Sequence, residues 1–140
     1  MPKFALQLNE YANGEVLIYN LVVDGVDQFY AFEDSLEDQF LSEFKSFGAI
    51  IYQISHKKTP AKGKRRIIKG VEGGREMKSR NLRLYYLVIK ELGIVVCLGA
   101  NKKTQKKDLK RLDKIRKAIV EQIKKNGKPN IQIKEENDDE

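Results

Sequence analysis

The chain has little cysteine and histidine and no long hydrophobic run. Cys97 and His56 are the single residues of their kinds among 140. One cysteine excludes an intramolecular disulfide and a cysteine-rich zinc site, and one histidine excludes a ribonuclease mechanism that uses two histidines. No apolar run approaches the roughly 20 residues that cross a bilayer, and the first residues lack the apolar core of a signal peptide. A soluble, cytoplasmic protein without metal or cofactor is therefore expected.

Positive charge is concentrated in the middle of the chain. The formal net charge is +7. Residues 1–55 hold two lysines or arginines against nine carboxylates, residues 56–117 hold 21 against five, and residues 118–140 hold four against six. A cationic segment between acidic ones focuses positive potential on the surface that it forms. A polyanion such as RNA or DNA is the expected partner, although a charge run can also serve only to solvate a surface.

The first 33 residues carry the signals of a β-hairpin. Two apolar stretches, Phe4–Leu8 and Glu15–Leu21, flank Asn13-Gly14, which is a strong short-range hairpin signal. We interpret residues 1–33 as an N-terminal β-hairpin extension of the domain.

The next segment changes from an apolar helix pattern to a polar loop. A helix is predicted to begin at Asp34 or Ser35 and to stop at Gly48. The short β-branched stretch 49–55 predicts a strand, although a buried helix would have a similar pattern. Residues 56–66 contain proline and glycine without an apolar period, so an exposed basic loop is expected.

The second half of the chain is dominated by a β-hairpin and a helix. The apolar runs 82–89 and 94–98 predict the hairpin, and residues 75–78 predict a strand before it. A cationic loop then leads into a helix that ends near Gly127. Its apolar positions recur at helical spacing at Leu109, Leu112, Ile115, Ile119 and Ile123. Residues 128–140 are expected to form a flexible acidic tail.

Together these elements predict one α+β domain over residues 1–127. A chain of 140 residues can bury one ordinary core. The expected architecture is a twisted antiparallel β-sheet with helices packed on one face.

Residues 67–123 resemble the C-terminal half of the RelE/HigB superfamily of toxins from bacterial type II toxin–antitoxin modules, especially its phage-derived branch. The resemblance rests on Gly-Arg-Glu-Met-Lys, on Asn-Leu-Arg-Leu-Tyr-Tyr, and on Gly-Ala-Asn-Lys-Lys-Thr-Gln-Lys-Lys-Asp between an apolar strand and an amphipathic helix. Its most specific part is Lys102–Lys106. The resemblance implies a RelE-like fold and a metal-independent endoribonuclease that cleaves mRNA, in many members on the ribosome, and that a cognate antitoxin neutralises.

The same resemblance implies roles for individual cations. Arg83 corresponds to the phosphate-binding arginine of the family. Arg75 and Lys78 take the place of residues that activate or orient the nucleophile, and Lys102 and Lys103 lie where the family has a cation opposite the leaving group. The residues expected to bind RNA around them are Arg65, Arg66, Arg80, Tyr85, Lys106 and Lys107.

Strand alternation places Arg83 and Tyr85 on one face of the hairpin and Tyr86 on the other. The same residues also have structural interpretations. An arginine deters association at a strand edge, and a tyrosine in a hairpin commonly packs in the core.

Two other functions are compatible with the same residues. A ParE-like toxin would share the fold, lack the ribonuclease residues and inhibit DNA gyrase. A basic module that binds nucleic acid without catalysis would fit the charge distribution equally well. The acidic first segment could also dock against the cationic segment of a second copy, so a homodimer is a further alternative.

Overall fold

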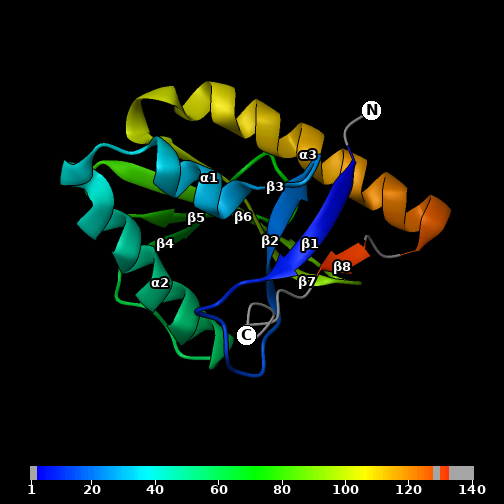
Figure 1. The fold of residues 1–140 in the computed structure, drawn as a ribbon, viewed down its shortest axis with the longest axis horizontal. Helices are drawn as coiled ribbons and strands as arrows, with labels where there is room; N and C mark the ends of the chain where they lie inside the picture. The colour runs from blue at the N-terminus through cyan, green and yellow to red at the C-terminus, as the bar shows by residue number, and fades with distance from the viewer. Residues whose placement is uncertain (1–2, 128–129, 133–140) are drawn as a thin grey trace, which may run out of the picture.

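The computed structural model describes residues 3–127 and 130–132, which form one mixed β-sheet with helices (Figure 1). Seven strands lie in the order β4-β5-β6-β7-β2-β1-β8, and the short β3 pairs with β2. The strands are β1 (Phe4–Leu8), β2 (Ile18–Val23), β3 (Val26–Asp27), β4 (Arg65–Ile67), β5 (Gly74–Lys78), β6 (Leu82–Ile89), β7 (Gly93–Asn101) and β8 (Asn130–Gln132). The helices are α1 (Gln28–Ser35), α2 (Leu41–Ser55) and α3 (Gln105–Asn126), with short 3₁₀ helices η1 (Asp38–Phe40) and η2 (Lys102–Thr104).

The predicted α+β class is confirmed, but the prediction of a fully antiparallel sheet is wrong. Strands β4 to β7 are antiparallel, as are β1 and β2, whereas β2 pairs with β7 and β1 pairs with β8 in parallel. The register places Ile18 of β2 beside Ile94 of β7. The N-terminal strands are therefore an integral part of the sheet and not an extension of it.

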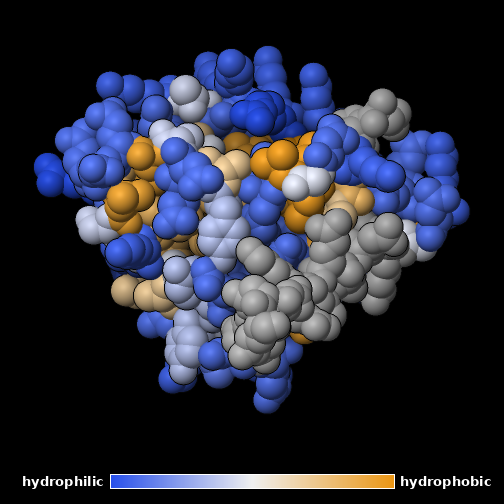
Figure 2. Space-filling model, in the orientation of Figure 1, coloured by the Kyte–Doolittle hydropathy of each residue, from blue (hydrophilic) through white to orange (hydrophobic). Residues whose placement is uncertain are grey.

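Helices cover both faces of the sheet, so the prediction of helices on one face is also wrong. Leu112 and Ile119 of α3 pack in one core cluster with Leu87 of β6. Phe29 of α1 and Phe44 of α2 belong to a second cluster; its sheet residues include Leu84, Tyr86 and Val96. Because neighbouring strand residues point to opposite faces, β6 and β7 contribute to both clusters. The outer side of α3 is hydrophilic (Figure 2), and none of the described helices is both long and apolar enough to cross a bilayer.

The region predicted as one helix and one strand forms two helices. Asp27 caps α1 through hydrogen bonds from the backbone N–H groups of Phe29 and Tyr30, at 2.9 and 3.2 Å. Helix α2 then continues through Gly48 to Ser55. Its buried residues recur at helical spacing, namely Phe44, Phe47, Ile50, Ile51 and Ile54. The strand predicted over 49–55 is wrong because these β-branched residues extend the apolar stripe of α2.

The predicted Asn13-Gly14 hairpin turn is also wrong, although β1 and β2 do pair in antiparallel fashion. Residues 9–17 form a longer loop that packs against the end of α2. The backbone N–H of Gly14 donates to Ser55 Oγ at 3.3 Å, and the N–H of Val16 donates to the Ser55 carbonyl at 2.9 Å. A tertiary contact has therefore replaced the local turn.

The last helix agrees with the sequence prediction. Helix α3 runs to Asn126, and Gly127 follows with a φ of 77° and donates its N–H to the Ile123 carbonyl at 3.0 Å. This left-handed conformation favours glycine and ends the helix. Residues 130–132 then form β8, so the prediction of a flexible tail is wrong there. Residues 133–140 of the predicted tail lie outside the described residues.

Glu43 of α2 holds the turn between β5 and β6 in place. Its carboxylate accepts hydrogen bonds from Ser79 Oγ at 2.6 Å and from the backbone N–H and Nδ2 of Asn81 at 2.7 and 2.8 Å. Burial raises the pKa of Glu43, but the hydrogen bonds from Ser79 and Asn81 outweigh burial and hold this pKa below its ordinary value of 4.5.

We expect Glu43→Ala to lower the free energy of unfolding by about 2 kcal/mol, the range for hydrogen bonds to a charged group. Because the pKa of Glu43 is lower in the folded state, this stabilisation is complete above the unfolded-state pKa and is lost as the pH falls through the folded-state pKa. Urea unfolding at pH 7 and pH 3 measures both effects, with Glu43→Gln as the control that keeps one acceptor oxygen. The prediction would be contradicted if Glu43→Ala lowered the free energy of unfolding by the same amount at pH 3 as at pH 7.

Candidate functional site

A buried carboxylate lies among arginines on the face of the sheet that α3 covers. Glu76 of β5 has no exposed surface. Its Oε2 accepts a hydrogen bond from Arg66 Nε at 2.8 Å, its Oε1 lies 3.9 Å from Arg83 Nε, and Oε1 also accepts a hydrogen bond from Gln105 Nε2 at 3.3 Å. These four residues and Tyr85 are called the Glu76 cluster below. Buried ionisable groups with specific charge partners are typical of functional sites and of structural ion-pair networks.

Strand register assembles the Glu76 cluster. Arg66 of β4 lies directly opposite Glu76, and Glu76 lies directly opposite Tyr85 of β6. Residues directly opposite in antiparallel strands share a face, so the three side chains form a row across the sheet. Arg83 lies two residues from Tyr85 on the same face of β6. The first turn of α3 contributes Gln105 from above the sheet.

Arg83 is held rigidly at the edge of the cluster. Its Nη1 donates hydrogen bonds to the carbonyl oxygens of Ser79 at 2.8 Å and Leu82 at 2.9 Å. Its side chain is 15% exposed, whereas that of Arg66 is 52% exposed. Arg83 is therefore a fixed positive charge, and Arg66 is the cation that can move toward solvent.

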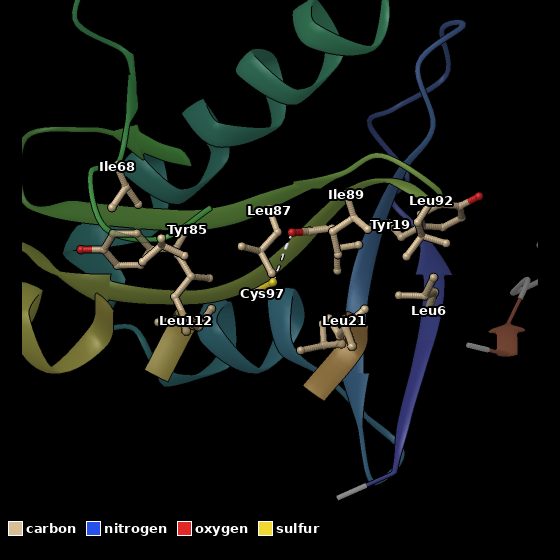
Figure 3. Close-up of a cluster of buried hydrophobic side chains, with 14 residues drawn as sticks. Leu6, Tyr19, Leu21, Ile68, Tyr85, Leu87, Ile89, Leu92, Cys97 and Leu112 are labelled. Carbon is tan, nitrogen blue, oxygen red and sulfur yellow. Dashed lines mark hydrogen bonds between the residues drawn. The ribbon is translucent and has the colours of Figure 1, made fainter. Parts of the chain in front are cut away.

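The hydroxyl of Tyr85 is buried in the cluster, and no hydrogen-bond partner for it is found among the described residues. Burial is the main cause that raises the pKa of Tyr85 to about 12, and the charges of Glu76 and Asp108 add to it. Asp108 is itself buried and accepts a hydrogen bond from Thr104 Oγ1. Figure 3 shows the Tyr85 ring near Ile68 and Leu112, with its hydroxyl directed away from the other labelled side chains. This hydroxyl is protonated at neutral pH and can donate a hydrogen bond.

The structure brings together only part of the predicted catalytic set. Lys78 lies directly opposite Arg83, so these two cations share the α3 face. Arg75 lies directly opposite Tyr86, which packs in the cluster under α2, so Arg75 is on the other face. Arg65 also lies on that other face, because it is opposite the buried Met77 of the same cluster.

The predicted lysines are exposed and flank Gln105 along the chain. Lys102 and Lys103 form η2 directly after β7, and Lys106 and Lys107 belong to the first turn of α3. The hydrogen bond from Gln105 to Glu76 attaches this turn to the cluster. Asn101 fixes the start of η2, because its Oδ1 accepts from the backbone N–H of Lys103 at 2.9 Å. The predicted RNA-binding residue Arg80 is exposed in the turn between β5 and β6.

The central residue of this cluster, Glu76, was missed by the sequence prediction. Its signal in the sequence is that Glu76 is the one acidic residue between positions 73 and 90, in a strand flanked by cations. Gln105 and Asp108 were missed because they are close to Glu76 or Tyr85 only through the packing of α3 on the sheet.

No family model, curated protein or solved structure matches the chain. Within the described ranges, no three His, Cys, Asp or Glu side chains are grouped to hold a metal ion. The Glu76 cluster itself offers the side chains of arginine, glutamate, glutamine and tyrosine.

Proposed function

We propose that this protein is a toxin-type, metal-independent endoribonuclease with the Glu76 cluster as its active site. The observation that carries the proposal is a buried carboxylate held between two arginines beside the hydroxyl of Tyr85. RNA cleavage without a metal requires a base for the 2′-hydroxyl and fixed cations for the phosphoryl oxygens. The cluster contains both kinds of group. Ribosome-bound mRNA as the substrate and a cognate antitoxin as the inhibitor are carried over from the resemblance.

In the proposed reaction, Glu76 takes the proton of the ribose 2′-hydroxyl. The 2′-oxygen forms a bond to phosphorus while the bond from phosphorus to the 5′-oxygen breaks, which yields a 2′,3′-cyclic phosphate and a 5′-hydroxyl. Arg83 and Arg66 neutralise the charge that develops on the phosphoryl oxygens. The leaving 5′-oxygen takes its proton from an ammonium group of η2, from Lys102 or Lys103.

In the proposed reaction, access to Glu76 requires displacement of one partner, Arg66. Arg66 covers the carboxylate but is itself half-exposed at the edge strand β4. A guanidinium binds phosphate through two parallel hydrogen bonds, so an RNA phosphate competes with Glu76 for Arg66. Substrate binding would then uncover the base, while Arg83 stays fixed by its two backbone carbonyl partners.

A second candidate function is RNA binding without catalysis. It is favoured by the complete burial of Glu76 and by the engagement of Arg83 with protein oxygens, which are also the marks of a structural ion pair. The exposed lysines of η2 and α3 would then bind RNA by charge alone, with a steep dependence on salt concentration.

The two functions are separated by an assay with purified protein and ribosome-bound mRNA at the Mg²⁺ concentration that keeps the ribosome assembled, and by a parallel assay with free mRNA in EDTA. We expect cleavage to products with 2′,3′-cyclic phosphate ends, and no cleavage where the nucleotide on the 5′ side of the scissile bond carries a 2′-deoxyribose. Arg83→Ala is expected to lower the rate by two to three orders of magnitude, as loss of a transition-state charge donor does. Lys90→Ala, at the opposite end of β6, is the matched control and should cleave like wild type.

The same assay can reject the proposal. Intact RNA that is nevertheless bound, with affinity falling steeply as salt rises, would establish the binding function instead. Intact RNA together with inhibition of DNA gyrase would favour the ParE-like alternative. Cleavage of the 2′-deoxy substrate would rule out attack by the 2′-hydroxyl.

A further inference from the structure

A second cationic pocket lies on the face of the sheet opposite the Glu76 cluster. Its volume is about 460 Å³, and its lining includes side chains of β4, β5 and β6. The register places Ile67, Arg75 and Tyr86 in one row across these strands. The side chains that carry the argument below are Arg65, Ile67, Arg75, Tyr86 and Val88, called the Arg75 pocket.

The two arginines of the Arg75 pocket lack acidic partners in the described part of the chain. No carboxylate there lies within 4.0 Å of Arg65 or Arg75, whereas Arg66, which also lines the pocket, is paired with Glu76. Arg75 donates from Nη1 to the carbonyl of the preceding residue, Gly74, at 3.0 Å. Two cations at one pocket without a carboxylate leave a positive charge that an anion can neutralise.

The floor of the pocket supplies a hydrogen-bond donor. Tyr86 is 1% exposed, and its hydroxyl makes no hydrogen bond of ordinary length and angle among the described residues, although the Arg65 guanidinium lies close enough to it to contribute a weak one. Burial raises the pKa of Tyr86, whereas the charge of Arg65, its weak hydrogen bond and the charge of Arg75 lower it, with burial prevailing. The hydroxyl therefore keeps its proton at neutral pH. A buried hydroxyl without a partner costs free energy, which a ligand oxygen at this position would recover.

The rim of the pocket is apolar. Ile67 is 68% exposed and Val88 is 41% exposed, and both are among the few large hydrophobic side chains that the described residues expose to this extent. Exposed β-branched residues beside cations suit a ligand that has an apolar face next to its charge. Inorganic phosphate offers the charge alone, whereas a nucleotide offers a phosphate and a flat base.

We propose that the Arg75 pocket binds a nucleotide, with its phosphate between Arg65 and Arg75 and its base against Ile67 and Val88. The Tyr86 hydroxyl donates to a phosphate oxygen. The nucleotide is either free or one residue of an RNA strand, because both present the same phosphate and base. The site lies on the opposite face from the Glu76 cluster and requires no cleavage chemistry, so it goes beyond the endoribonuclease proposal.

The proposal is tested by calorimetric titration of the full chain with AMP, adenosine, inorganic phosphate and a five-nucleotide RNA. AMP should bind at least tenfold more tightly than adenosine or phosphate. Arg75→Gln should weaken AMP binding about tenfold, the loss of a charge-assisted hydrogen-bond pair. Tyr86→Phe should weaken it several-fold with little loss of thermal stability, since the hydroxyl makes no hydrogen bond of ordinary geometry in the described part of the protein. Lys90→Gln is the control and should bind like wild type.

The outcomes distinguish a free nucleotide from an RNA strand, and they test the nucleotide site independently of the ribonuclease proposal. A five-nucleotide RNA that binds tenfold more tightly than AMP identifies an RNA strand as the source of the nucleotide, provided that Arg75→Gln weakens the binding of both ligands. Equal affinities for AMP and for the RNA identify a free nucleotide. Arg83→Ala removes a cation of the Glu76 cluster that does not line the Arg75 pocket, and it should leave AMP binding unchanged, so a failure of the ribonuclease proposal does not affect this one. Adenosine that binds as tightly as AMP, or a folded Arg65→Gln/Arg75→Gln double variant that binds AMP like wild type, would overturn the nucleotide site.

Discussion

Glu76→Gln is expected to slow RNA cleavage by a factor of about 10²–10⁴, the usual contribution of a positioned general base. Glutamine keeps the shape of the side chain and one acceptor oxygen for Arg66, but it cannot take the proton of the 2′-hydroxyl. The two arginines stay in place and Arg66 loses its charged competitor, so substrate affinity should stay the same or rise and the loss should fall on kcat. Single-turnover cleavage of ribosome-bound mRNA at saturating protein measures the effect.

The control for this experiment is folding, because removal of one partner from a buried ion pair costs up to about 3–5 kcal/mol. The cost should be at the lower end here, since Arg66 is half-exposed and Arg83 keeps its two carbonyl partners. Circular dichroism and urea unfolding of Glu76→Gln therefore accompany the kinetics. If Glu76→Gln unfolds, Glu76→Asp keeps the charge but withdraws it by one methylene, and slow cleavage by this folded variant supports the same role. A folded Glu76→Gln that cleaves at the wild-type rate would leave the Glu76 cluster as a structural ion pair.

Gly14→Ala is expected to destabilise the protein by about 3 kcal/mol, at the upper end of the range for overpacking. A Cβ at this position would lie 2.3 Å from the carbonyl oxygen of Ser55 and 2.5 Å from its carbonyl carbon. Both atoms belong to the backbone at the end of α2 and cannot rotate away. The loop 9–17 would have to lift off α2, which breaks the hydrogen bonds of Gly14 and Val16 to Ser55.

Gly25→Ala is the matched control for the glycine experiment. A Cβ on Gly25 meets no described atom within 4 Å, but the φ of +84° is left-handed and disfavours alanine. The expected cost is about 1–2 kcal/mol from backbone strain alone. Urea unfolding at pH 7 compares the two variants. Equal destabilisation by both would mean that the loop is not packed closely on α2.

Local patterns were enough to predict β6, β7 and α3, but the loop predicted over 56–66 is wrong at residues 65–66, which begin β4 and pair with β5. The alternation of β6 and β7 and the helical spacing of Leu112 and Ile119 are long and regular, so β6, β7 and α3 agree with the prediction. The stretch 49–55 is too short for its period to separate strand from helix. Asn13-Gly14 is a genuine turn signal, but the conformation of this segment is decided by the contact of Gly14 with Ser55. That contact joins residues far apart in the sequence, so a local pattern cannot predict it.

The sequence was enough to predict which side chains of one strand share a face, but not which residues of neighbouring strands lie opposite each other. Alternation correctly placed Arg83 with Tyr85 and apart from Tyr86. The register of β5 against β6 is a separate quantity, and a shift by one residue moves every side chain of a strand to the other face. That register places Glu76, and not Arg75, beside Arg83. The arginines named from the sequence are therefore divided between two faces, which is what separates the Glu76 cluster from the Arg75 pocket.

The division of β6 between two faces has a practical consequence for spectroscopy. Tyr85 and Tyr86 are joined by one peptide bond, yet their rings lie on opposite sides of the sheet. The chain contains no tryptophan and only six tyrosines. Among the six resonances of fluorine-labelled tyrosine, one would report on the Glu76 cluster and one on the Arg75 pocket. Ligand titrations could be followed on both sides of the protein within the same sample.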